Sequence, residues 1–429
     1  MPKATNPEVV VIGAGPGGSV AATRLAKLGR SVLVLERRVF PRFHIGESLL
    51  PSLMVTLRKA GILETVLAEG GWVKKYGGEF SFDFGQVLRF PFSDQGPGRF
   101  PSAIQVERAR FDHTLLRCAR DAGATVLEGA NVTDLLIEDD RVTGVTYEHE
   151  GKQHTVRSSL VIDAGGRASK IARAFGLRKH IERLRMVAVF QHFNGLVEAN
   201  NPGFAGDIQV GAHKDGWVWG IPIGPDTLSI GAVMQREVLK DRDPEQVLNE
   251  HLSRAARVAQ RAIGTSPISE VKVETDYCYY ADTITGPGWL MVGDAACFLD
   301  PIFSGGATLA ATTGLRAADT ADRMLREPAL EAELGDAYSS FLKTGYDTYA
   351  RLIYAHYRSQ FSIIPTLLEI GVEVLDDGTT THHAEVIRLI SGDFWSKTNE
   401  LGNRLRARSD MDTFAPFTPD LDCPFYDFA

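Results

Sequence analysis

Residues 9–36 read VVVIGAGPGGSVAATRLAKLGRSVLVLE and carry the clearest structural signal in the chain. A short apolar run, Val9–Ile12, leads into a glycine-rich loop, which is followed by a helical stretch of small and apolar residues. Gly29 stands where a glycine commonly ends a helix, and residues 31–35 form a second apolar run that ends at Glu36. This succession of strand, loop, helix and strand predicts a βαβ unit of the kind that binds dinucleotides.

The glycines of this loop are expected to have distinct roles. Gly13 permits the tight turn, Gly15 lets the backbone approach a pyrophosphate, and Gly18 lets helix and strand pack closely. The helix N-terminus then faces the phosphates, and the Glu36 carboxylate can accept hydrogen bonds from ribose hydroxyls. An ordinary glycine-rich turn is the alternative, but the order of strand, helix and acid favours a dinucleotide site. The motif alone does not separate NAD from FAD.

Two later segments predict further strands of the same parallel sheet. Residues 161–168 (VIDAGGRA) and 288–296 (GWLMVGDAA) each read as a strand that ends in a glycine-rich turn. Their carboxyl ends would meet the cofactor crevice. Between the first unit and these strands, residues 108–116 predict a helix, and residues 127–145 predict a short β-meander with its turn at 138–141.

The rest of the chain divides into antiparallel strands and helices. Apolar residues alternate around Phe80 and again around Trp217, which is the period of strands with one apolar face. The last third of the chain is mainly helical, with breaks expected at Gly345, Pro365 and Gly378. We therefore expect an α/β fold with a Rossmann-type cofactor domain, an inserted antiparallel β-sheet substrate domain and a C-terminal helical region.

The cofactor domain is expected to be discontinuous. The predicted boundaries are 1–75, 100–175 and 276–330 for the cofactor domain, 76–99 and 176–275 for the substrate domain, and 331–429 for the C-terminal helical region. The last region ends in an irregular tail from Phe414, which either packs against the surface, as we favour, or forms a lid over the substrate entrance.

The composition is typical of a soluble globular protein with two or three structural units in its 429 residues. The 46 Lys and Arg residues against 54 Asp and Glu give a net charge of −8, which argues against nucleic acid or an anionic membrane as partner. The four cysteines, Cys118, Cys278, Cys297 and Cys423, are too few to crosslink the chain, so we expect no disulfide and a cytoplasmic location. No stretch predicts a signal peptide or a membrane span.

With these motifs in order, the sequence resembles the flavoprotein monooxygenase superfamily over about residues 8–325. The resemblance rests on the fingerprint that ends at Glu36, on Arg108 in R-x-x-F-D, on residues 163–166 (DAGG) and on Asp294 in the Gly-Asp pair. It implies a bound FAD, with Arg108 beside its ribityl-pyrophosphate part and Asp294 hydrogen-bonded to the ribityl chain. The cofactor domain would then be an FAD-binding domain.

Three further motifs resemble those of flavin-dependent halogenases. Residues 40–51 read FPRFHIGESLLP and contain a Gly-Glu-Ser loop, which related isoprenoid reductases share. Residues 216–222 read GWVWGIP and match G-W-x-W-x-I-P, and residues 298–306 read FLDPIFSGG and match F-x-x-P-x-x-S-x-G. Many halogenases continue the last motif with Val-His, whereas this chain continues it with Ala307 and Thr308.

The resemblance implies a lysine between flavin and substrate, within residues 72–80 (WVKKYGGEF). Lys75 fits the family's spacing better than Lys74. Its ammonium would hydrogen-bond hypohalous acid, or its amine would form a haloamine, and so direct the halogen to an electron-rich carbon. Burial would lower the pKa of such a lysine and raise the fraction of neutral amine. Without the resemblance, either lysine reads as a solvated surface residue.

Two motifs leave alternatives open. Trp217 and Trp219 project to the same face of the predicted strand, either as core aromatics or, as the resemblance implies, as a wall between flavin and substrate. Ser304, Gly305 and Gly306 precede a helix, and their exposed N–H groups would hold an anion, either the reduced flavin or a halide. The alternative is a loop that only cradles the flavin.

The function implied by the resemblance is FAD-dependent halogenation. Reduced FAD, O₂ and chloride or bromide would give hypohalous acid, which halogenates a phenol, pyrrole or indole, either free or on an acyl or peptidyl carrier protein. Because no second dinucleotide motif occurs, a separate NAD(P)H-dependent flavin reductase would supply the FADH2. The alternatives are a monooxygenase, an isoprenoid or alkene reductase of the same fold, and a flavin-binding protein without catalysis.

The catalytic candidate is Lys75. The cofactor-binding candidates are Gly13, Gly15, Pro16, Gly18, Glu36, Arg37, Glu47, Ser48, Arg108, Asp163, Gly165, Asp294, Pro301, Gly305 and Gly306, although Glu47 and Ser48 could equally contact substrate. The candidates for the tunnel and substrate side are Trp217, Trp219, Ile221, Pro222 and Phe303, and those for the halide are Ser304, Gly305 and Gly306. His44 and the pair His382-His383 show no metal-ligand spacing, so we expect structural histidines and no metal.

Overall fold

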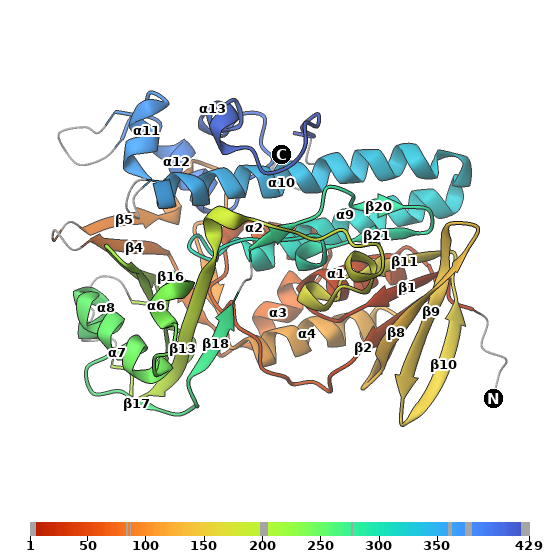
Figure 1. Ribbon diagram of the computed structural model, residues 1–429, viewed down its shortest axis with the longest axis horizontal. Coiled ribbons are helices and arrows are strands. Elements are labelled where there is room, and N and C mark those ends of the chain that lie inside the picture. The colour runs from red at the N-terminus through yellow and green to blue at the C-terminus, as the bar shows by residue number, and fades with distance from the viewer. Residues whose placement is uncertain are drawn as a thin grey trace.

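The computed structural model describes residues 6–82, 85, 87–197, 205–275, 278–358, 363–373 and 380–421. Figure 1 shows a parallel sheet with its helices at one end of the long axis and a larger sheet at the other end. One long helix, α10 (Glu331–Arg358), extends across the top of both parts. The expected α/β architecture with a helical C-terminal region is therefore confirmed.

The first sheet has six strands, five of them parallel and one edge strand, Thr285–Gly286, antiparallel to its neighbour, and it contains the predicted βαβ unit. β1 (Val9–Ile12) pairs in parallel with β2 (Val32–Glu36), and α1 (Pro16–Lys27) connects them. β1 also pairs in parallel with β11 (Leu160–Asp163), which pairs with β21 (Trp289–Met291), so both later strands are confirmed. β1 is buried along its whole length, as an uninterrupted apolar run predicts for a strand covered on both faces. The strand order is β20 (Thr285–Gly286), β21, β11, β1, β2, β7 (Thr125–Glu128).

Helices pack closely against this sheet and against one another. α9 (Gly306–Arg326) crosses α1 where Gly314 meets Gly17, since a Cβ on Gly314 would lie 2.3 Å from the Gly17 carbonyl oxygen. The helix predicted around residue 108 is α4 (Arg108–Asp121), which packs on the other side of α1. The N-termini of these helices are thereby brought to the carboxyl edge of the sheet.

A β-meander surrounds the predicted turn at 138–141 as a separate three-stranded sheet, but it spans residues 131–157 rather than 127–145, because residues 127 and 128 belong to β7 of the six-stranded sheet. Its first turn contains Asp139 and Asp140, both with positive φ, which aspartate tolerates better than most residues. The strands are β8 (Asn131–Glu138), β9 (Arg141–His149) and β10 (Lys152–Arg157).

The larger sheet has eight strands. β15 (Gly216–Pro222) pairs antiparallel with β14 (Ile208–His213) and with β16 (Thr227–Gln235), and all of its residues are buried. One pair departs from the expected antiparallel sheet: β4 (Gly77–Phe82) runs parallel to β14. A hairpin would force antiparallel pairing, but β4 comes from a segment far earlier in the chain. The other strands are β5 (Val87–Pro91), β13 (Met186–Asn194), β17 (Ser266–Pro267) and β18 (Lys272–Thr275).

Short helices cover the face of this sheet that carries glycines. A Cβ on Gly220 would lie 2.9 Å from Val258 Cγ1, and a Cβ on Gly211 would lie 2.6 Å from Ala255 Cβ. Glycine therefore lets a helix approach the strands closely on the side opposite Trp217. The helices are α6 (Arg236–Leu239), α7 (Pro244–Arg254) and α8 (Ala256–Arg261).

The predicted break at Gly345 is wrong, because α10 continues through it. A Cβ there would lie 2.1 Å from Trp395 Cζ2, so glycine serves to admit the indole rather than to end the helix. Pro365 stands in the first turn of α11 (Ile364–Glu369) and begins a helix rather than ending one. Gly378 lies outside the described residues. The last helices are α12 (His383–Ile390) and α13 (Glu400–Arg406).

Residues 414–421 of the tail contain no helix or strand, as predicted, and the domain boundaries stay a prediction. Cys118, Cys278 and Cys297 are free and buried, whereas Cys423 lies outside the described residues. Among the helices of the described residues, none combines the length and the apolar character that crossing a bilayer requires.

Candidate functional site

The glycine loop between β1 and α1 is tight on its protein side and open on the other. Gly13 has φ +88° and donates its N–H to the Leu35 carbonyl oxygen at 2.9 Å. A Cβ on Gly18 would lie 2.0 Å from the Gly13 carbonyl oxygen, so this position requires glycine. A Cβ on Gly15, by contrast, would meet a single neighbour, the Arg42 side chain, at 3.9 Å. Space therefore remains beside Gly15.

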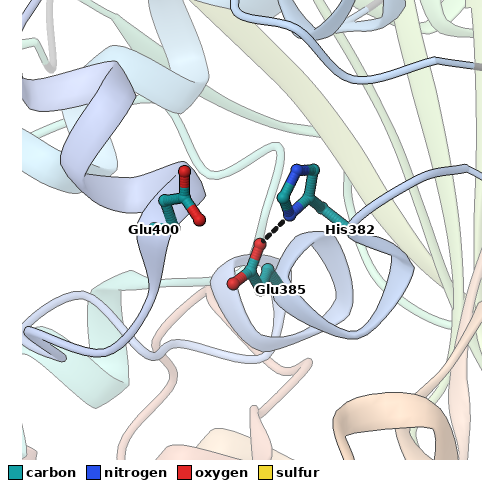
Figure 2. A group of neighbouring side chains, drawn as sticks. All are labelled: His382, Glu385 and Glu400. Carbon is teal, nitrogen blue, oxygen red and sulfur yellow. Dashed lines mark ion pairs between the residues drawn. The ribbon is translucent and has the colours of Figure 1, made fainter.

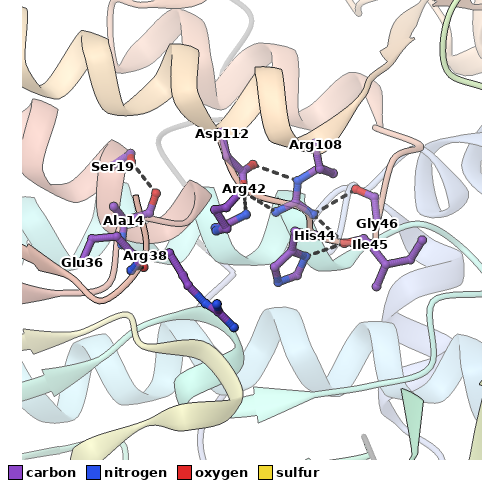
Figure 3. Close-up of polar contacts among 10 residues, drawn as sticks. All are labelled: Ala14, Ser19, Glu36, Arg38, Arg42, His44, Ile45, Gly46, Arg108 and Asp112. Atoms are coloured by element: carbon purple, nitrogen blue, oxygen red, sulfur yellow. Dashed lines mark hydrogen bonds and ion pairs between the residues drawn. The ribbon is translucent and has the colours of Figure 1, made fainter. Parts of the chain in front are cut away.

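The ends of α1 and β2 meet at this open side. Pro16 occupies the start of α1, and the first-turn N–H groups have no acceptor within the helix. The buried Glu36 carboxylate accepts the N–H groups of Ala14 at 2.8 Å and of Arg38 at 2.9 Å (Figure 3). It holds the loop and keeps further lone pairs for hydroxyl donors. Arg37 is exposed.

Arg108 ties the Gly-Glu-Ser loop to α4 (Figure 3). Its Nε and Nη2 donate to the Asp112 carboxylate at 2.8 and 3.0 Å, and its Nη1 donates to the carbonyl oxygens of Ile45 and Gly46 at 2.9 and 3.0 Å. Burial alone would lower the pKa of Arg108, but the Asp112 carboxylate raises it above the usual value. His44 Nδ1 donates to the Ile45 carbonyl oxygen at 2.6 Å, and its role as a structural histidine stays a prediction.

Arg42 is a second cation here, which sequence reasoning did not name. It pairs with Asp112 at 2.7 Å, and its guanidinium lies 4.6 Å from the centre of the Phe40 ring. The same side chain is the neighbour of the open position at Gly15. A positive charge is therefore held where phosphates at the α1 N-terminus would need one. The sequence feature that could have indicated Arg42 is its position in residues 40–51, the segment that contains the Gly-Glu-Ser loop.

Asp163 is fully buried at the end of β11, and its carboxylate accepts hydrogen bonds from the protein. Its Oδ1 accepts the Gly165 N–H at 2.8 Å, and its Oδ2 accepts the Ser169 hydroxyl at 2.8 Å and the Ile171 N–H at 2.9 Å. Burial raises its pKa, and these three donors oppose the change. Asp163 therefore fixes the glycine turn that follows β11.

Asp294 follows β21 and differs from Asp163. Among the described residues, no hydrogen-bond donor is assigned to its carboxylate, and its backbone carbonyl accepts the Tyr279 hydroxyl at 2.7 Å. Burial raises its pKa to about 7, although Arg108 and Arg167 oppose the change. The carboxyl group can therefore accept or donate a hydrogen bond at neutral pH, and it is left for a ligand.

These groups fit an FAD molecule. The phosphates would be held by the first turn of α1 and by Arg42, and the adenosine ribose by Glu36. The hydroxyls of the ribityl chain would be held by Asp294, whose carboxylate the described residues leave without a donor. Figure 3 also shows the Arg38 side chain extended without a drawn contact, and like Arg42 it is a cation that sequence reasoning did not name.

Glu47 and Ser48 are both buried but have different partners. Glu47 Oε1 lies 2.7 Å from Nε2 of His192 on β13. Burial opposes the protonation of this histidine, but Glu47 outweighs it and raises the pKa of His192. Ser48 Oγ accepts a hydrogen bond from Lys75, so the Gly-Glu-Ser loop reaches the lysine directly.

Lys75 is the last residue of β3 (Val73–Lys75), which pairs with β6 (Ala103–Gln105). Its side chain is 2% exposed. Nζ donates to Ser48 Oγ at 2.8 Å and to the Leu49 carbonyl oxygen at 3.0 Å. Both acceptors are neutral, so the ammonium has no carboxylate in hydrogen-bond contact among these partners.

The surroundings separate Lys75 from Lys74. Burial lowers the pKa of Lys75 to about 7, although the Asp207 carboxylate opposes the change. Lys74 is exposed and lies over the Tyr76 ring at 4.9 Å. Successive residues of a strand point to opposite faces, which explains why only one of the two lysines enters the interior.

Trp217 and Trp219 lie on the same face of β15, with ring centroids 5.8 Å apart. Both are buried, and both indole N–H groups have partners: Trp219 Nε1 donates to Ser229 Oγ at 3.1 Å, and Trp217 Nε1 donates to the Tyr357 hydroxyl at 2.9 Å. The rings are part of the core, and a role as a wall beside the flavin stays a prediction.

A chain of hydrogen bonds joins Trp217 to the loop before α9. The Tyr357 hydroxyl donates to Asp300 Oδ2 at 2.8 Å, and Asp300 Oδ1 accepts the Ile302 N–H at 3.1 Å. Sequence reasoning named neither Tyr357 nor Asp300. Asp300 lies inside the F-x-x-P motif, but Tyr357 comes from α10 and had no local signal.

The predicted exposure of three N–H groups before α9 is wrong for two of them. Ser304 has φ +58° and donates its N–H to the Pro301 carbonyl oxygen at 2.8 Å. Gly305 donates to the Tyr349 hydroxyl at 3.2 Å, and a Cβ there would lie 2.6 Å from the Tyr349 ring. A Cβ on Gly306 would meet nothing within 4 Å. The open side of the loop is therefore at Gly306.

The remaining candidates for the substrate side are buried. The Phe303 ring lies 5.9 Å from the Phe80 ring and 5.8 Å from the His356 ring between centroids. Burial lowers the pKa of His356 to about 3, so its ring is neutral. Ile221 and Pro222 end β15. Their assignment to the substrate side stays a prediction.

Figure 2 shows a cluster that the sequence prediction for His382 excluded. His382, Glu385 and Glu400 have possible ligand atoms within 4.8 Å of one another. His382 Nδ1 lies 2.6 Å from Glu385 Oε2, and Arg404 Nε donates to Glu400 at 3.1 Å. Because each carboxylate already faces a partner group of the chain, we interpret the cluster as contacts within the protein and assign no metal to it.

Comparison with known proteins identifies several similar proteins. The family profile described as tryptophan halogenase matches residues 8–99 and 91–361. The chain is 34% identical over 337 residues to a tryptophan 2-halogenase of Chondromyces crocatus, and the match covers 74% of this chain and 61% of that protein. It is also 34% identical over 318 residues to a 1H-pyrrole-2-carbonyl-[peptidyl-carrier protein] brominase of Pseudoalteromonas luteoviolacea, covering 73% of this chain and 76% of that protein. The solved flavin-dependent brominase Bmp2 superposes with a TM-score of 0.82 at 27% identity, covering 94% of this chain and 98% of that one.

Proposed function

The chain belongs to the tryptophan halogenase family, and we propose that it is an FAD-dependent halogenase of electron-rich aromatic compounds. The observation that carries this proposal is the amine of Lys75, which is buried against neutral acceptors beside the Gly-Glu-Ser loop, with a pKa lowered by burial to about 7. Burial of a lysine without a carboxylate among its hydrogen-bond partners is costly, and groups of this kind concentrate at functional sites.

We propose that reduced FAD binds across the carboxyl edge of the six-stranded sheet and that the eight-stranded sheet forms the substrate side. Bound in reduced form, FAD supplies with O₂ the oxidising equivalent that converts chloride or bromide to hypohalous acid. Glu36, Arg42 and Asp294 hold the cofactor, while Arg108 and Asp163 keep the surrounding loops in position.

Lys75 then passes the halogen to the substrate. The neutral amine can accept halogen from hypohalous acid: an N–halogen bond forms, the O–halogen bond breaks, and the hydroxide leaves as water with one amine proton. The protonated amine can instead donate a hydrogen bond to hypohalous acid and orient it. A pKa of about 7 leaves both forms populated at neutral pH, and Ser48 and Leu49 hold Nζ in place.

The halide would bind near the N-terminus of α9. Gly306 is the open position of the loop, and the first-turn N–H groups of a helix attract anions. Trp217 and Trp219 would separate this point from the substrate, and the bonds through Tyr357 and Asp300 would keep the strand and the loop in register.

The substrate is a phenol, pyrrole or indole, either free or tethered. One relative is named for tryptophan and another for a pyrrole carbonyl group on a peptidyl carrier protein, which supports both modes. A separate NAD(P)H-dependent reductase supplies the FADH2, because the sequence carries one dinucleotide fingerprint. The free cysteines of the described residues fit a reducing, cytoplasmic setting for both proteins.

A coupled assay tests the function. The purified chain is supplied with FAD, a flavin reductase, NADH, O₂, bromide and a phenol or pyrrole, and the products are analysed by mass spectrometry. We expect a product with the bromine isotope doublet that is absent without bromide. A hydroxylated product, or a reduced alkene in a matched assay, would instead assign the chain to a monooxygenase or reductase. Tight FAD binding without turnover would indicate a flavin-binding protein.

A further inference from the structure

A short turn before β14 contacts the backbone on both sides of Lys75, although the two segments are far apart in sequence. Asp207 Oδ1 accepts the N–H groups of Tyr76 at 2.7 Å and of Gly77 at 2.8 Å. Gly206 has φ +81°, and a Cβ there would lie 2.0 Å from the Lys74 carbonyl oxygen. The Gly206–Asp207 turn therefore contacts the residue before Lys75 and the two residues after it.

The turn is itself held from three elements. Arg89 of β5 donates to Asp207 Oδ2 at 2.9 and 3.2 Å, and Arg261 of α8 donates to the Asp207 carbonyl oxygen at 2.7 Å. Gln105 of β6, the strand beside Lys75, donates to the Gly206 carbonyl oxygen at 3.0 Å. Asp207 is fully buried, so its charge acts in a region of low dielectric.

Within the described part of the chain, few other charged groups act on the Lys75 amine. The strand β6 offers Ala103 opposite it, and the Phe92 ring lies 5.3 Å from Nζ. Glu47 of the Gly-Glu-Ser loop faces His192, and Lys74 points to the exposed face. Burial lowers the pKa of Lys75, and the carboxylate of Asp207 is the charged group that opposes this.

We propose that Asp207, with Arg89 as its counter-ion, is the positioning residue of Lys75: it fixes the strand that carries the lysine and sets the fraction of neutral amine. This inference rests on the proposed role of Lys75 in halogen transfer. An anion near an ammonium favours the charged form, so Asp207 keeps the lysine partly protonated at neutral pH. Arg89 partly cancels that anion and thereby limits the effect.

The proposal predicts opposite effects for two substitutions. Asp207→Asn keeps an oxygen that can accept the two N–H groups but removes the charge, so the proton affinity of Lys75 falls. Arg89→Gln leaves the Asp207 anion uncompensated, so the proton affinity of Lys75 rises. A loss of structure alone would not move the two variants in opposite directions.

The test titrates Lys75 directly, in the full-length chain loaded with oxidised FAD. Lysines are labelled with ¹³C at Cε and ¹⁵N at Nζ, and the Lys75 signal is assigned by its loss in Lys75→Arg. We expect the titration midpoint to fall in Asp207→Asn by roughly one pH unit, and to rise by less in Arg89→Gln because solvent screens the partly exposed guanidinium. The matched control is Glu79→Gln. Glu79 lies on β4, the strand beside β14, and is another buried carboxylate that pairs with an arginine, Arg257 of α8. The titration midpoint of Lys75 in this variant should equal that in the wild type.

The outcomes separate this inference from the proposed function. Midpoints that shift in the same direction in Asp207→Asn and Arg89→Gln, or a shift in Glu79→Gln equal to that in Asp207→Asn, overturn it. If Asp207→Asn does not fold, an unchanged or lowered midpoint in Arg89→Gln overturns it as well. The titration needs no halogenation, so the absence of halogenated product would refute the proposed function while the measured shifts still decide the role of Asp207. If halogenation does occur, its pH profile should move with the midpoint.

Discussion

Arg108 and Lys75 are both buried cations of the same site, but their surroundings give them opposite properties. Arg108 donates to the Asp112 carboxylate, which raises its pKa although burial alone would lower it. Lys75 donates to a hydroxyl and a carbonyl oxygen, and burial lowers its pKa to about 7. The two residues are 5% and 2% exposed, so the partner rather than the degree of burial makes the difference.

The contrast explains which residue can serve chemistry. A cation that touches a carboxylate keeps its proton and is held in one geometry, which suits the anchoring of the Gly-Glu-Ser loop. A buried amine with neutral acceptors loses part of its proton affinity and becomes available as a nucleophile. Each side of the contrast can be altered by a single substitution.

The largest effect is expected for Lys75→Ala. Removal of the amine takes away the group that carries the halogen, and the rate of halogenation should fall by about 1,000-fold, the middle of the range for loss of a catalytic group. Lys74→Ala is the matched control, because this neighbour is exposed on the other face of the strand, and it should halogenate at the wild-type rate. Product formation is followed by mass spectrometry with FAD saturating. Wild-type halogenation by Lys75→Ala would refute the assignment of Lys75.

The next effect is expected for Arg108→Ala. It leaves the buried Asp112 with Arg42 as its remaining partner and releases the carbonyl groups of Ile45 and Gly46. Loss of one partner of a buried pair typically costs about 3–5 kcal/mol, so FAD affinity should fall by about 100-fold or more as the loop is released. Affinity is measured by the change in flavin fluorescence on titration with protein. Arg110→Ala, which removes a half-exposed pair with Glu69, should bind FAD normally; equal affinities in the two variants would argue against the anchoring of the Gly-Glu-Ser loop by Arg108.

The sequence could predict those features of the site that depend on residues within one local motif. Gly13, Gly18 and Glu36 lie within one βαβ unit, so their spacing alone predicts their arrangement. The burial of Lys75 instead depends on the loop that carries Ser48 and on the turn at Asp207, which lies more than a hundred residues away.

Two wrong predictions, for Gly305 and Gly345, also result from contacts with distant segments of the chain. The predicted free N–H of Gly305 is occupied by Tyr349, and the predicted helix break at Gly345 is filled by Trp395. Both partners come from segments at least 40 residues away, so the local sequence does not predict these contacts. Arg42 was not predicted for a different reason. It lies within residues 40–51, but only the Gly-Glu-Ser residues of this segment were assigned a role.

A third substitution, Lys75→Met, should stabilise the protein at low pH. In the folded chain the pKa of Lys75 is about 7 against an ordinary value of 10.5, so below pH 7 both folded and unfolded chains are protonated and the folded one bears the full cost of a buried charge. As the pH rises from about 7 to 10.5, the folded amine is neutral while the unfolded one still binds its proton, and this cost disappears. The gain of Lys75→Met over the wild type should therefore be about 3 kcal/mol larger at pH 6 than at pH 9.

Thermal and urea unfolding at the two pH values measure this difference. The control is Lys74→Met, whose exposed side chain bears no such cost and whose effect should not depend on pH in this range. A gain for Lys75→Met that is equal at both pH values, or larger at pH 9, would show that Lys75 has an ordinary proton affinity in the folded protein.

The smallest effect is expected for Tyr349→Phe, which changes the loop before α9 rather than the lysine. The hydroxyl of Tyr349 accepts the Gly305 N–H and donates to the Asp300 carbonyl oxygen at 2.9 Å. Without it, the Gly305 N–H has lost its acceptor in the protein and can join Gly306 in binding an anion. One additional hydrogen bond to the halide, partly offset by the loss at Asp300, should lower the KM for bromide by about threefold with kcat nearly unchanged. The KM is obtained by varying bromide in the coupled assay at saturating FAD and substrate. A KM for bromide that is unchanged or raised would indicate that the halide binds away from this loop, and that the N-terminus of α9 only supports the flavin.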